Sequence, residues 1–153
     1  MTQEEKMLLI KDLSARLPYA VTVEHTSGFR STLHNITIHH MYDDNDNVYD
    51  AICYTDFFGD NDDIYIEFFK PYLFPLSNMT DEQWRELFET AGYEVREEDC
   101  GRHTEMYYYQ LVGHENELYP NSDAIDWFNK NHFDYRGLID KGLALDATGK
   151  NIY

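Results

Sequence analysis

Lysine and arginine are missing from a long part of this chain. Residues 31–69 hold nine Asp and Glu residues and no Lys or Arg. The whole chain has 153 residues, with 12 Lys and Arg against 29 Asp and Glu, and a formal net charge of −17. The acids of residues 31–69 cannot be neutralised by local salt bridges, so they stay hydrated, bind a cation or face a basic partner. The same charge argues against direct binding to nucleic-acid phosphates.

Cysteine and long apolar runs are also scarce. Cys53 and Cys100 are too few for a disulfide framework and suit a reducing compartment. No apolar run approaches the length of a membrane span, and the first residues are acidic where a signal peptide is basic. We therefore expect a cytoplasmic protein that does not bind membranes. A hydrophobic content of 42% is enough for a folded core, and no repeat or linker divides the chain, so we expect one domain over residues 1–153.

Two helices are marked by their capping residues. Thr2 and Glu5 have the spacing of a capping box at the start of a segment with helical apolar period, and Pro18 is expected to end that helix. Thr80 and Gln83 form a second capping box, which predicts another helix after residue 80.

The last third of the chain is also expected to be mostly helical. Ser122 is expected to cap a helix with Trp127 near its buried side. Asp134 is expected to cap a short helix over residues 135–142. The tail that follows is expected to pack through Leu143 and Leu145 and then to fray.

Between the first two helices the apolar period changes to two, which is typical of β-strands. The strand-like segments of residues 19–70 are separated by turns rich in Gly, Asp and Asn. Pro71 and Pro75 cannot donate to a central ladder, so we expect the sheet to close before them. The predicted fold is α+β: an N-terminal helix, a bent antiparallel meander resembling a small SH3-like barrel, and covering helices after residues 80 and 122.

Two acidic turns, DDND and GDNDD, are the candidate binding surface. An EF-hand loop needs Gly at position 6 and Glu at position 12, but counting from Asp43 places Val48 and Tyr54 there. The other starting points fail as well, so the turns do not predict an EF-hand, although their oxygens could still be pooled on one ion. We interpret them as turns between strands whose charge is available to a partner. Their acids are Asp43, Asp44, Asp46, Asp60, Asp62 and Asp63.

A zinc site is not predicted. Cys100 and His103 have a Cys-x2-His spacing, and Cys53 and His114 would have to complete the ligand set. Structural zinc sites usually show two such tight pairs, and this chain has one. We therefore expect no metal, and a free cysteine in a turn or core.

Two further clusters each have a chemical and a structural interpretation. His132, Asp134 and Arg136 suggest acid–base or phosphate chemistry, but at a corner between helices a local role is favoured, with Asp134 as a cap and Arg136 in solvent. Tyr107–Tyr109 are expected to form a strand that is aromatic on both faces. It could stack on nucleic-acid bases, but the acidic charge argues against this and favours a core or a protein interface.

Three stretches of the chain resemble one group of proteins. They are MTQEEKMLLIKDLSARLPY, KPYLFPLSNMTDEQ and DWFNKNHFDYRGLIDKGLALDATG. They resemble a group of small uncharacterised proteins encoded by phages, prophages and other mobile elements of gut bacteria. The resemblance implies a mobile-element origin and supplies no catalytic residues.

The sequence contains no P-loop, no Gly-x-Gly-x-x-Gly and no Gly-x-Ser-x-Gly motif. We therefore expect a non-enzymatic, protein-binding accessory factor of a phage or mobile element. It would act on a basic host protein through an acidic, aromatic-bearing surface, without a cofactor. Two alternatives stay open: a nucleic-acid mimic that inhibits a host defence nuclease, and a small-ligand-binding protein or enzyme whose site is assembled from distant residues. Self-association is also left open.

Overall fold

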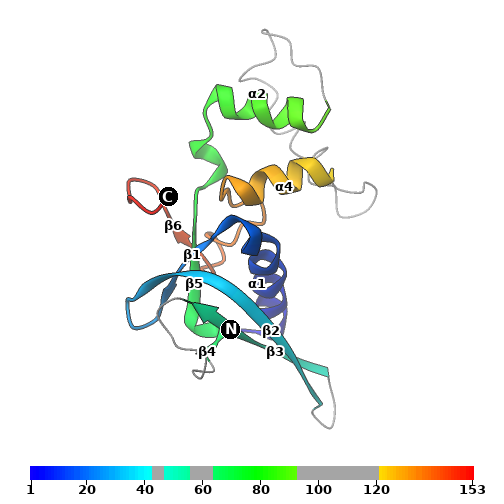
Figure 1. The fold of residues 1–153 in the computed structure, drawn as a ribbon, viewed down its shortest axis with the longest axis vertical. Helices are drawn as coiled ribbons and strands as arrows, with labels where there is room; N and C mark the ends of the chain where they lie inside the picture. Colours follow the sequence, from blue (N-terminus) through cyan, green and yellow to red (C-terminus); the bar gives the residue numbers. More distant parts are fainter. Residues whose placement is uncertain (43–46, 56–63, 93–120) are drawn as a thin grey trace.

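In the described residues six strands form one mixed sheet, and α1 (Gln3–Arg16) packs against it (Figure 1). The computed structural model describes residues 1–42, 47–55, 64–92 and 121–153. The strand order is β4-β3-β2-β1-β5-β6, and the α+β class is confirmed. The strands are β1 (Thr22–His25), β2 (Arg30–Tyr42), β3 (Asn47–Thr55), β4 (Ile64–Tyr65), β5 (Phe69–Leu73) and β6 (Leu145–Asp146).

Helix α1 has the ends that its sequence predicts. Thr2 Oγ1 accepts a hydrogen bond from the Glu5 N–H, and Glu5 Oε2 accepts one from the Thr2 N–H at 2.7 Å. This reciprocal pair satisfies two donors that the first turn would otherwise leave free. A 3₁₀ turn, Leu17–Tyr19, contains Pro18 and follows the helix directly.

The antiparallel meander is confirmed for the first four strands. β1 pairs with β2, β2 with β3, and β3 with β4, all antiparallel. A shift in register between Leu33 and Asn35 marks a bulge in the long β2–β3 pair, and such bulges bend a strand. The described strands run in an open order from β4 to β6, so the SH3-like barrel is not confirmed.

The expectation that the sheet closes before Pro71 is wrong. β5 contains Pro71 and lies inside the sheet, antiparallel to β1 and parallel to β6. Pro71 is tolerated because β6 pairs with β5 only at Tyr72 and Leu73, so the missing N–H does not interrupt that ladder.

The strand expected after residue 63 is shorter than its alternating pattern suggests. β4 ends at Tyr65, and Ile66–Phe68 form a 3₁₀ turn. That turn buries the Ile66 side chain completely while Phe68 stays 41% exposed. A turn thus buries Ile66, whereas the alternating sequence pattern predicts that the strand continues through this position.

Helices α2 (Asp81–Thr90) and α4 (Ser122–Lys130) pack on each other beyond α1 (Figure 1). The Thr80–Gln83 capping box of α2 is present as predicted. The N-cap of α4 is Asn121 and not Ser122, because Asn121 Oδ1 accepts from two backbone N–H groups of the first turn. Asn121 Nδ2 also donates to the Ala91 carbonyl at 3.0 Å, which ties the start of α4 to the end of α2.

The short helix expected over residues 135–142 is replaced by turns. Asp134 does cap this segment, since its carboxylate accepts from the Leu138 and Ile139 N–H groups at 2.8 and 2.7 Å. Gly137 and Gly142 have φ of +67° and +69°, a left-handed conformation that does not continue a helix.

The tail after Leu145 does not fray. The Ala147 N–H donates to the Leu73 carbonyl at 2.9 Å, beside the β5–β6 pair. Tyr153 Oη donates to the Tyr72 carbonyl at 2.7 Å and accepts from the Thr22 N–H at 3.3 Å. These bonds dock the last residues against two strands, which the polar sequence of the tail does not reveal.

The described residues bury two hydrophobic clusters. The sheet cluster joins α1 to the strands through Leu9, Leu13, Val23, Leu33 and Phe69, among others. The helical cluster joins α2, α4 and the turn after α4, and it contains Met79, Leu87, Phe88, Ala124, Trp127, Phe128, Phe133 and Tyr135. Burial of such side chains contributes roughly 1.5–3 kcal/mol each before chain entropy is counted.

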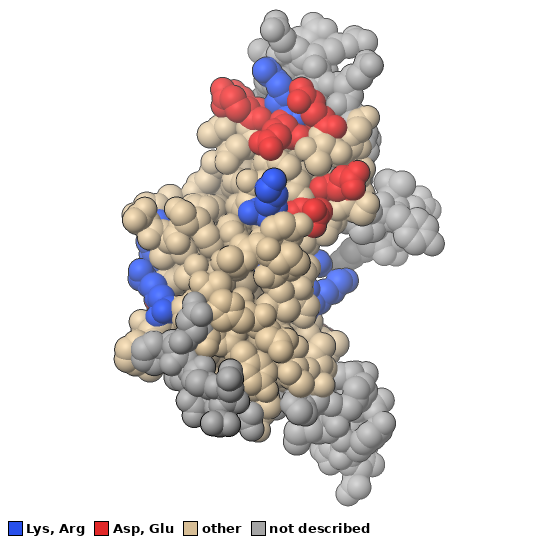
Figure 2. All heavy atoms as spheres, viewed as in Figure 1, with Lys and Arg blue, Asp and Glu red and all other residues tan. Residues whose placement is uncertain are grey.

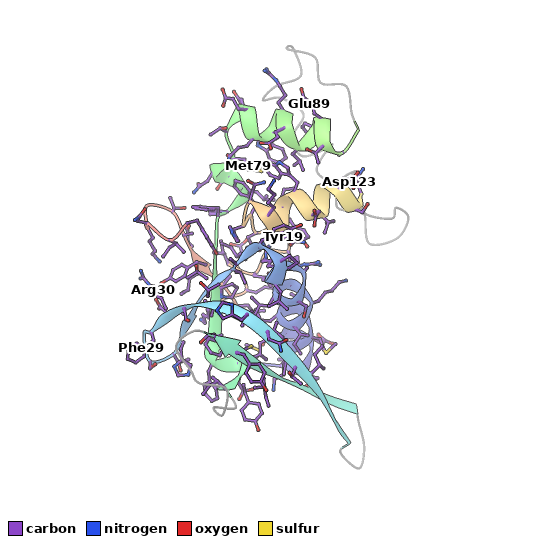
Figure 3. All side chains as sticks on the ribbon, in the orientation of Figure 1. Tyr19, Phe29, Arg30, Met79, Glu89 and Asp123 are labelled. Carbon is purple, nitrogen blue, oxygen red and sulfur yellow. The ribbon has the colours of Figure 1, made fainter. Side chains whose placement is uncertain are left out.

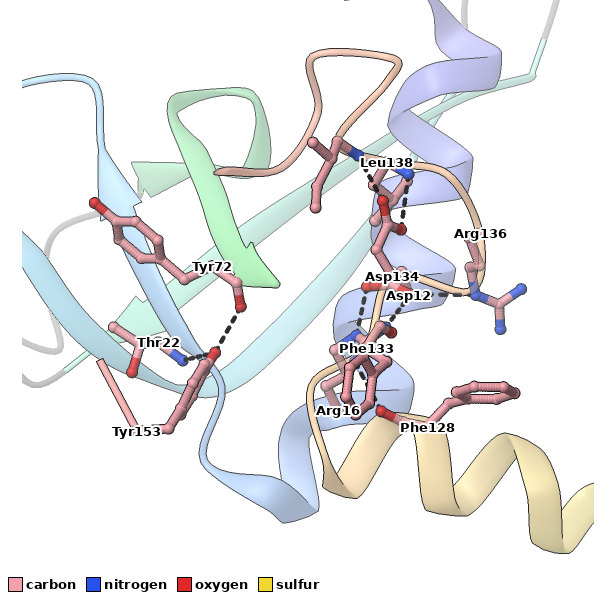
Figure 4. A network of polar contacts seen from close by, with 11 residues as sticks. Asp12, Arg16, Thr22, Tyr72, Phe128, Phe133, Asp134, Arg136, Leu138 and Tyr153 are labelled. Atoms are coloured by element: carbon pink, nitrogen blue, oxygen red, sulfur yellow. Dashed lines mark hydrogen bonds and ion pairs between the residues drawn. The ribbon is translucent and has the colours of Figure 1, made fainter. Parts of the chain in front are cut away.

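A buried arginine lies between the two clusters (Figure 4). Arg16, at the end of α1, is 0% exposed and makes a bidentate ion pair with the equally buried Asp12, at 2.7 and 3.1 Å. Its guanidinium also donates to the carbonyls of Phe133 at 2.8 Å and Phe128 at 3.4 Å. Arg136 Nε lies 3.2 Å from Asp12 Oδ1 on the other side. The expectation that Arg136 points into solvent is therefore wrong.

Replacing Asp12 tests this network. Asp12→Ala leaves two guanidinium groups without their carboxylate, one of them fully buried, and is expected to lower the free energy of unfolding by about 3–5 kcal/mol. Arg30→Gln is the matched control, because Arg30 pairs with Glu24 at a half-exposed site and its loss should cost about 1 kcal/mol or less. Urea unfolding followed by circular dichroism measures both. Equal losses in the two variants would contradict the assigned role of Asp12.

Candidate functional site

The acidic turns proposed from the sequence lie outside the described residues. This applies to Asp43, Asp44, Asp46, Asp60, Asp62 and Asp63. The strands expected within residues 93–119, including Tyr107–Tyr109, also lie outside them. These expectations stay predictions.

The cysteine that the structure describes is a core residue. Cys53 is fully buried in β3 and free, and burial raises the pKa of its thiol to about 12. It is therefore an inert thiol at neutral pH. Cys100, His103 and His114 lie outside the described residues. Across the described ranges, no group of three or more His, Cys, Asp and Glu side chains could hold a metal ion.

His132, Asp134 and Arg136 are close in sequence but serve different partners. Asp134 accepts from backbone N–H groups of the following turn. Arg136 pairs with Asp12 and stacks over the Tyr135 ring at 4.6 Å. Of the three, His132 is the one that lines the pocket described below. Asp134 and Arg136 therefore have structural roles, although Arg136 pairs with Asp12 and does not point into solvent. The role of His132 is considered separately below.

An acidic face covers the helix pair. Figure 2 shows red side chains gathered over α2 and α4, and Figure 3 shows Glu89 and Asp123 on the same end of the pair. Arg85 and Lys130 are the cations that these two helices carry. We define the helical acidic face by the exposed acids of α2 and α4: Asp81, Glu82, Glu86, Glu89, Asp123 and Asp126.

A pocket lies between the first turn of α2, the end of α4 and the last residues of the chain. Its volume is about 610 Å³. The walls come from four separate segments, which a local sequence pattern does not bring together. The lining residues are Phe74, Asn78, Thr80, Gln83, Lys130, Asn131, His132, Phe133, Thr148, Gly149 and Tyr153.

His132 enters this pocket because of an unusual helix end. The Phe133 N–H donates to the Phe128 carbonyl at 3.0 Å and the His132 N–H to the Asn129 carbonyl at 3.3 Å. This is a Schellman motif, in which the left-handed position is usually Gly. Here His132 occupies it with φ of +56°. A non-glycine residue in this conformation costs on the order of 1 kcal/mol, and such strain is often found at functional sites.

The His132 ring is held neutral. It stacks on the Tyr153 ring with centroids 3.7 Å apart and planes 7° apart, and the residue is 8% exposed. Burial, with a further contribution from the Arg16 charge, lowers its pKa to about 4. Its Nδ1 is buried and has no hydrogen-bond partner among the described residues. The strained backbone thus places a neutral imidazole at the pocket wall, with a buried Nδ1 that has no partner among the described residues.

The sequence contains one signal for this site that we interpreted as structural. The order of helix, Asn131, His132 and apolar Phe133 fits a helix C-terminus in which His replaces the usual Gly. The other walls of the pocket have no comparable signal, because Thr148 and Tyr153 reach it only through the docking of the tail.

Comparisons with known proteins found no family model, no curated protein and no solved structure that matches this chain. Within the described ranges, no helix has the length and apolar character needed to cross a membrane.

The neutral state of His132 predicts a pH effect on stability. The unfolded chain binds a proton at the ordinary pKa of about 6.5, whereas the folded chain binds it only near pH 4. Protonation therefore favours unfolding, and stability is lost as the pH falls from 6.5 towards 4. Since Asn tolerates the left-handed conformation, His132→Asn should lose about 2 kcal/mol less than the wild type between pH 7 and pH 4.5. Urea unfolding at both pH values measures this, and equal losses would contradict the buried neutral state.

Proposed function

We propose that this chain is a non-enzymatic, protein-binding accessory factor of a phage or mobile element, and that it binds a basic host protein through acidic surfaces. The observation that carries the proposal is the helical acidic face. Six exposed acids on two packed helices stand against two cations, Arg85 and Lys130. Such a field accelerates association with a basic partner and discriminates against acidic ones.

The arrangement of α2 supports a surface role for its acids. Glu82, Glu86 and Glu89 recur at intervals of four and three residues, so they lie on one side of the helix. The opposite side of α2 buries Leu87 and Phe88 in the helical cluster. These acids therefore contribute nothing to the core, and their charge is available to a partner.

The sequence predicts an acidic surface that also carries aromatic residues. Phe29, an exposed aromatic residue, lies beside the β1–β2 turn, far from Glu89 on α2 (Figure 3). The support for a contact at the helices is their charge, and Tyr153, 46% exposed, lines the pocket beside the first turn of α2. We expect the contact to be sensitive to salt, because the Debye length is about 8 Å at physiological ionic strength.

A nucleic-acid mimic is the second candidate. Its specific support is the row formed by Glu82, Glu86 and Glu89, which stand roughly one helical turn, about 5.4 Å, apart along α2. A regular row of carboxylates is the feature that a phosphate-binding protein would accept in place of a strand. The partner would then be a nuclease that the chain inhibits.

The experiment is a pull-down from host lysate with four forms of the tagged chain. The first is the wild type, and the second carries Glu82→Gln, Glu86→Gln and Glu89→Gln. The third carries Asp→Asn at the six acids proposed within residues 43–63. The matched control carries Glu4→Gln, Asp140→Asn and Asp146→Asn, exposed acids on other elements with the same change in charge as the helical variant.

We expect the amount of bound partner to fall about tenfold in the second form, the third form or both, and to stay unchanged in the control. A captured nuclease whose activity the wild-type chain inhibits would favour the mimic. A partner retained by both acidic variants, or lost equally in the control, would contradict binding through these surfaces.

A further inference from the structure

The pocket beside His132 has a composition that is unusual for this chain. None of the acids in the described residues lines it, although Asp81 and Glu82 are adjacent in sequence to lining residues. Three side-chain amides, two threonine hydroxyl groups and several aromatic rings, one of them the phenol of Tyr153, form most of its described wall, and Lys130 is the cation of that lining. A ligand here meets neutral hydrogen-bonding groups rather than the negative surface found over the helices.

One polar atom of each amide side chain makes a hydrogen bond within the protein. Asn78 Nδ2 donates to Thr148 Oγ1, and Asn131 Nδ2 donates to the Trp127 carbonyl at 3.0 Å. Gln83 Oε1 accepts from the Thr80 N–H at 2.9 Å. Among the described residues the other ends have no assigned partner. The pocket therefore offers acceptors from Asn78 and Asn131 and a donor from Gln83, already oriented by the first set of bonds.

His132 adds a second, independent observation. Its Nδ1 is buried beside the pocket without a partner among the described residues, and its backbone is strained. A buried polar atom left unpaired costs roughly 1–3 kcal/mol, so the fold holds this ring beside the pocket at a cost in stability. The stack of Tyr153 on His132 holds the imidazole in place, so the ring is positioned before a ligand arrives.

We propose that this pocket binds a small molecule recognised through a nucleobase, as a nucleoside or a nucleoside monophosphate. A base edge carries donors and acceptors side by side, which is the pattern that Asn and Gln side chains pair with. Planar bases also stack on aromatic rings such as those of this wall. The volume of about 610 Å³ lies within the range of roughly 300–1,000 Å³ typical of small-molecule sites.

The charge of the chain limits the size of the ligand. Lys130, at the end of α4, suits one phosphate group. A polynucleotide would bring many phosphates against a net charge of −17 and is disfavoured. Among the described residues, none of the acids proposed to bind a protein lines this pocket, although Asp81 and Glu82 lie beside it on the first turn of α2. The two proposals can therefore be tested separately, and each can fail without the other.

Isothermal titration calorimetry with the full chain tests the proposal. The probes are adenosine, guanosine, cytidine and uridine with their 5′-monophosphates. Benzoate and inorganic phosphate serve as comparators that have a ring or a charge but no base edge. We expect at least one base-bearing probe to bind about tenfold more tightly than either comparator. Absence of binding at millimolar concentration, or equal binding of benzoate, would overturn the proposal.

Gln83→Glu locates the site. Glu preserves the capping box of α2 but replaces the free donor of Gln83 with a carboxylate oxygen, so the variant should fold and bind about tenfold more weakly. Gln3→Glu, which adds the same charge to α1, is the matched control and should bind like the wild type. Lys130→Gln should remove any advantage of a monophosphate over its nucleoside. Unchanged binding in Gln83→Glu would overturn the assignment to this pocket.

Discussion

The buried guanidinium of Arg16 links the two hydrophobic clusters of the described residues. Arg16 leaves the end of α1 fully buried, pairs with Asp12 on its own helix and donates to two carbonyls of the segment that follows α4. A buried charge is tolerated only when it is paired and its donors are used, and Arg16 meets both conditions. Asp12 is in turn flanked by Arg136, so both ends of the pair are fixed. The geometry of the turn after α4 therefore depends on a residue more than a hundred positions earlier.

That dependence extends to the pocket. Arg16 binds the carbonyls of Phe128 and Phe133, and these two residues also close the Schellman turn around His132. The same charge contributes to lowering the pKa of His132, so it influences both the position and the protonation of the imidazole. The acids of the helical face lie outside this network, on the exposed surface of α2 and α4. The protein thus separates a charged outer face from a neutral, hydrogen-bonding interior site.

The parts of the fold that the sequence predicts are those set by neighbouring residues. Both capping boxes work over three positions, so Thr2 and Thr80 identify their helices directly. Asn121 replaces the expected cap Ser122 because it also reaches the end of α2, a contact between segments about 30 residues apart. Pro71 is tolerated within the sheet because β6 begins opposite Tyr72, a register that the local pattern does not encode. Likewise, nothing near Arg16 in the sequence marks it as buried, and the pocket is assembled from segments distant in the chain.

The central claim is that Arg16 fixes the turn that carries His132, and amide hydrogen exchange in Arg16→Lys tests it most directly. Lysine keeps the charge but lacks the planar fork that reaches Asp12 and two carbonyls together. We predict that the N–H groups of His132 and Phe133 lose far more protection than amides in the β1–β2 pair, because their turn opens locally. If the His132 and Phe133 amides lose no more protection from exchange than the amides of the β1–β2 pair, the claim is contradicted.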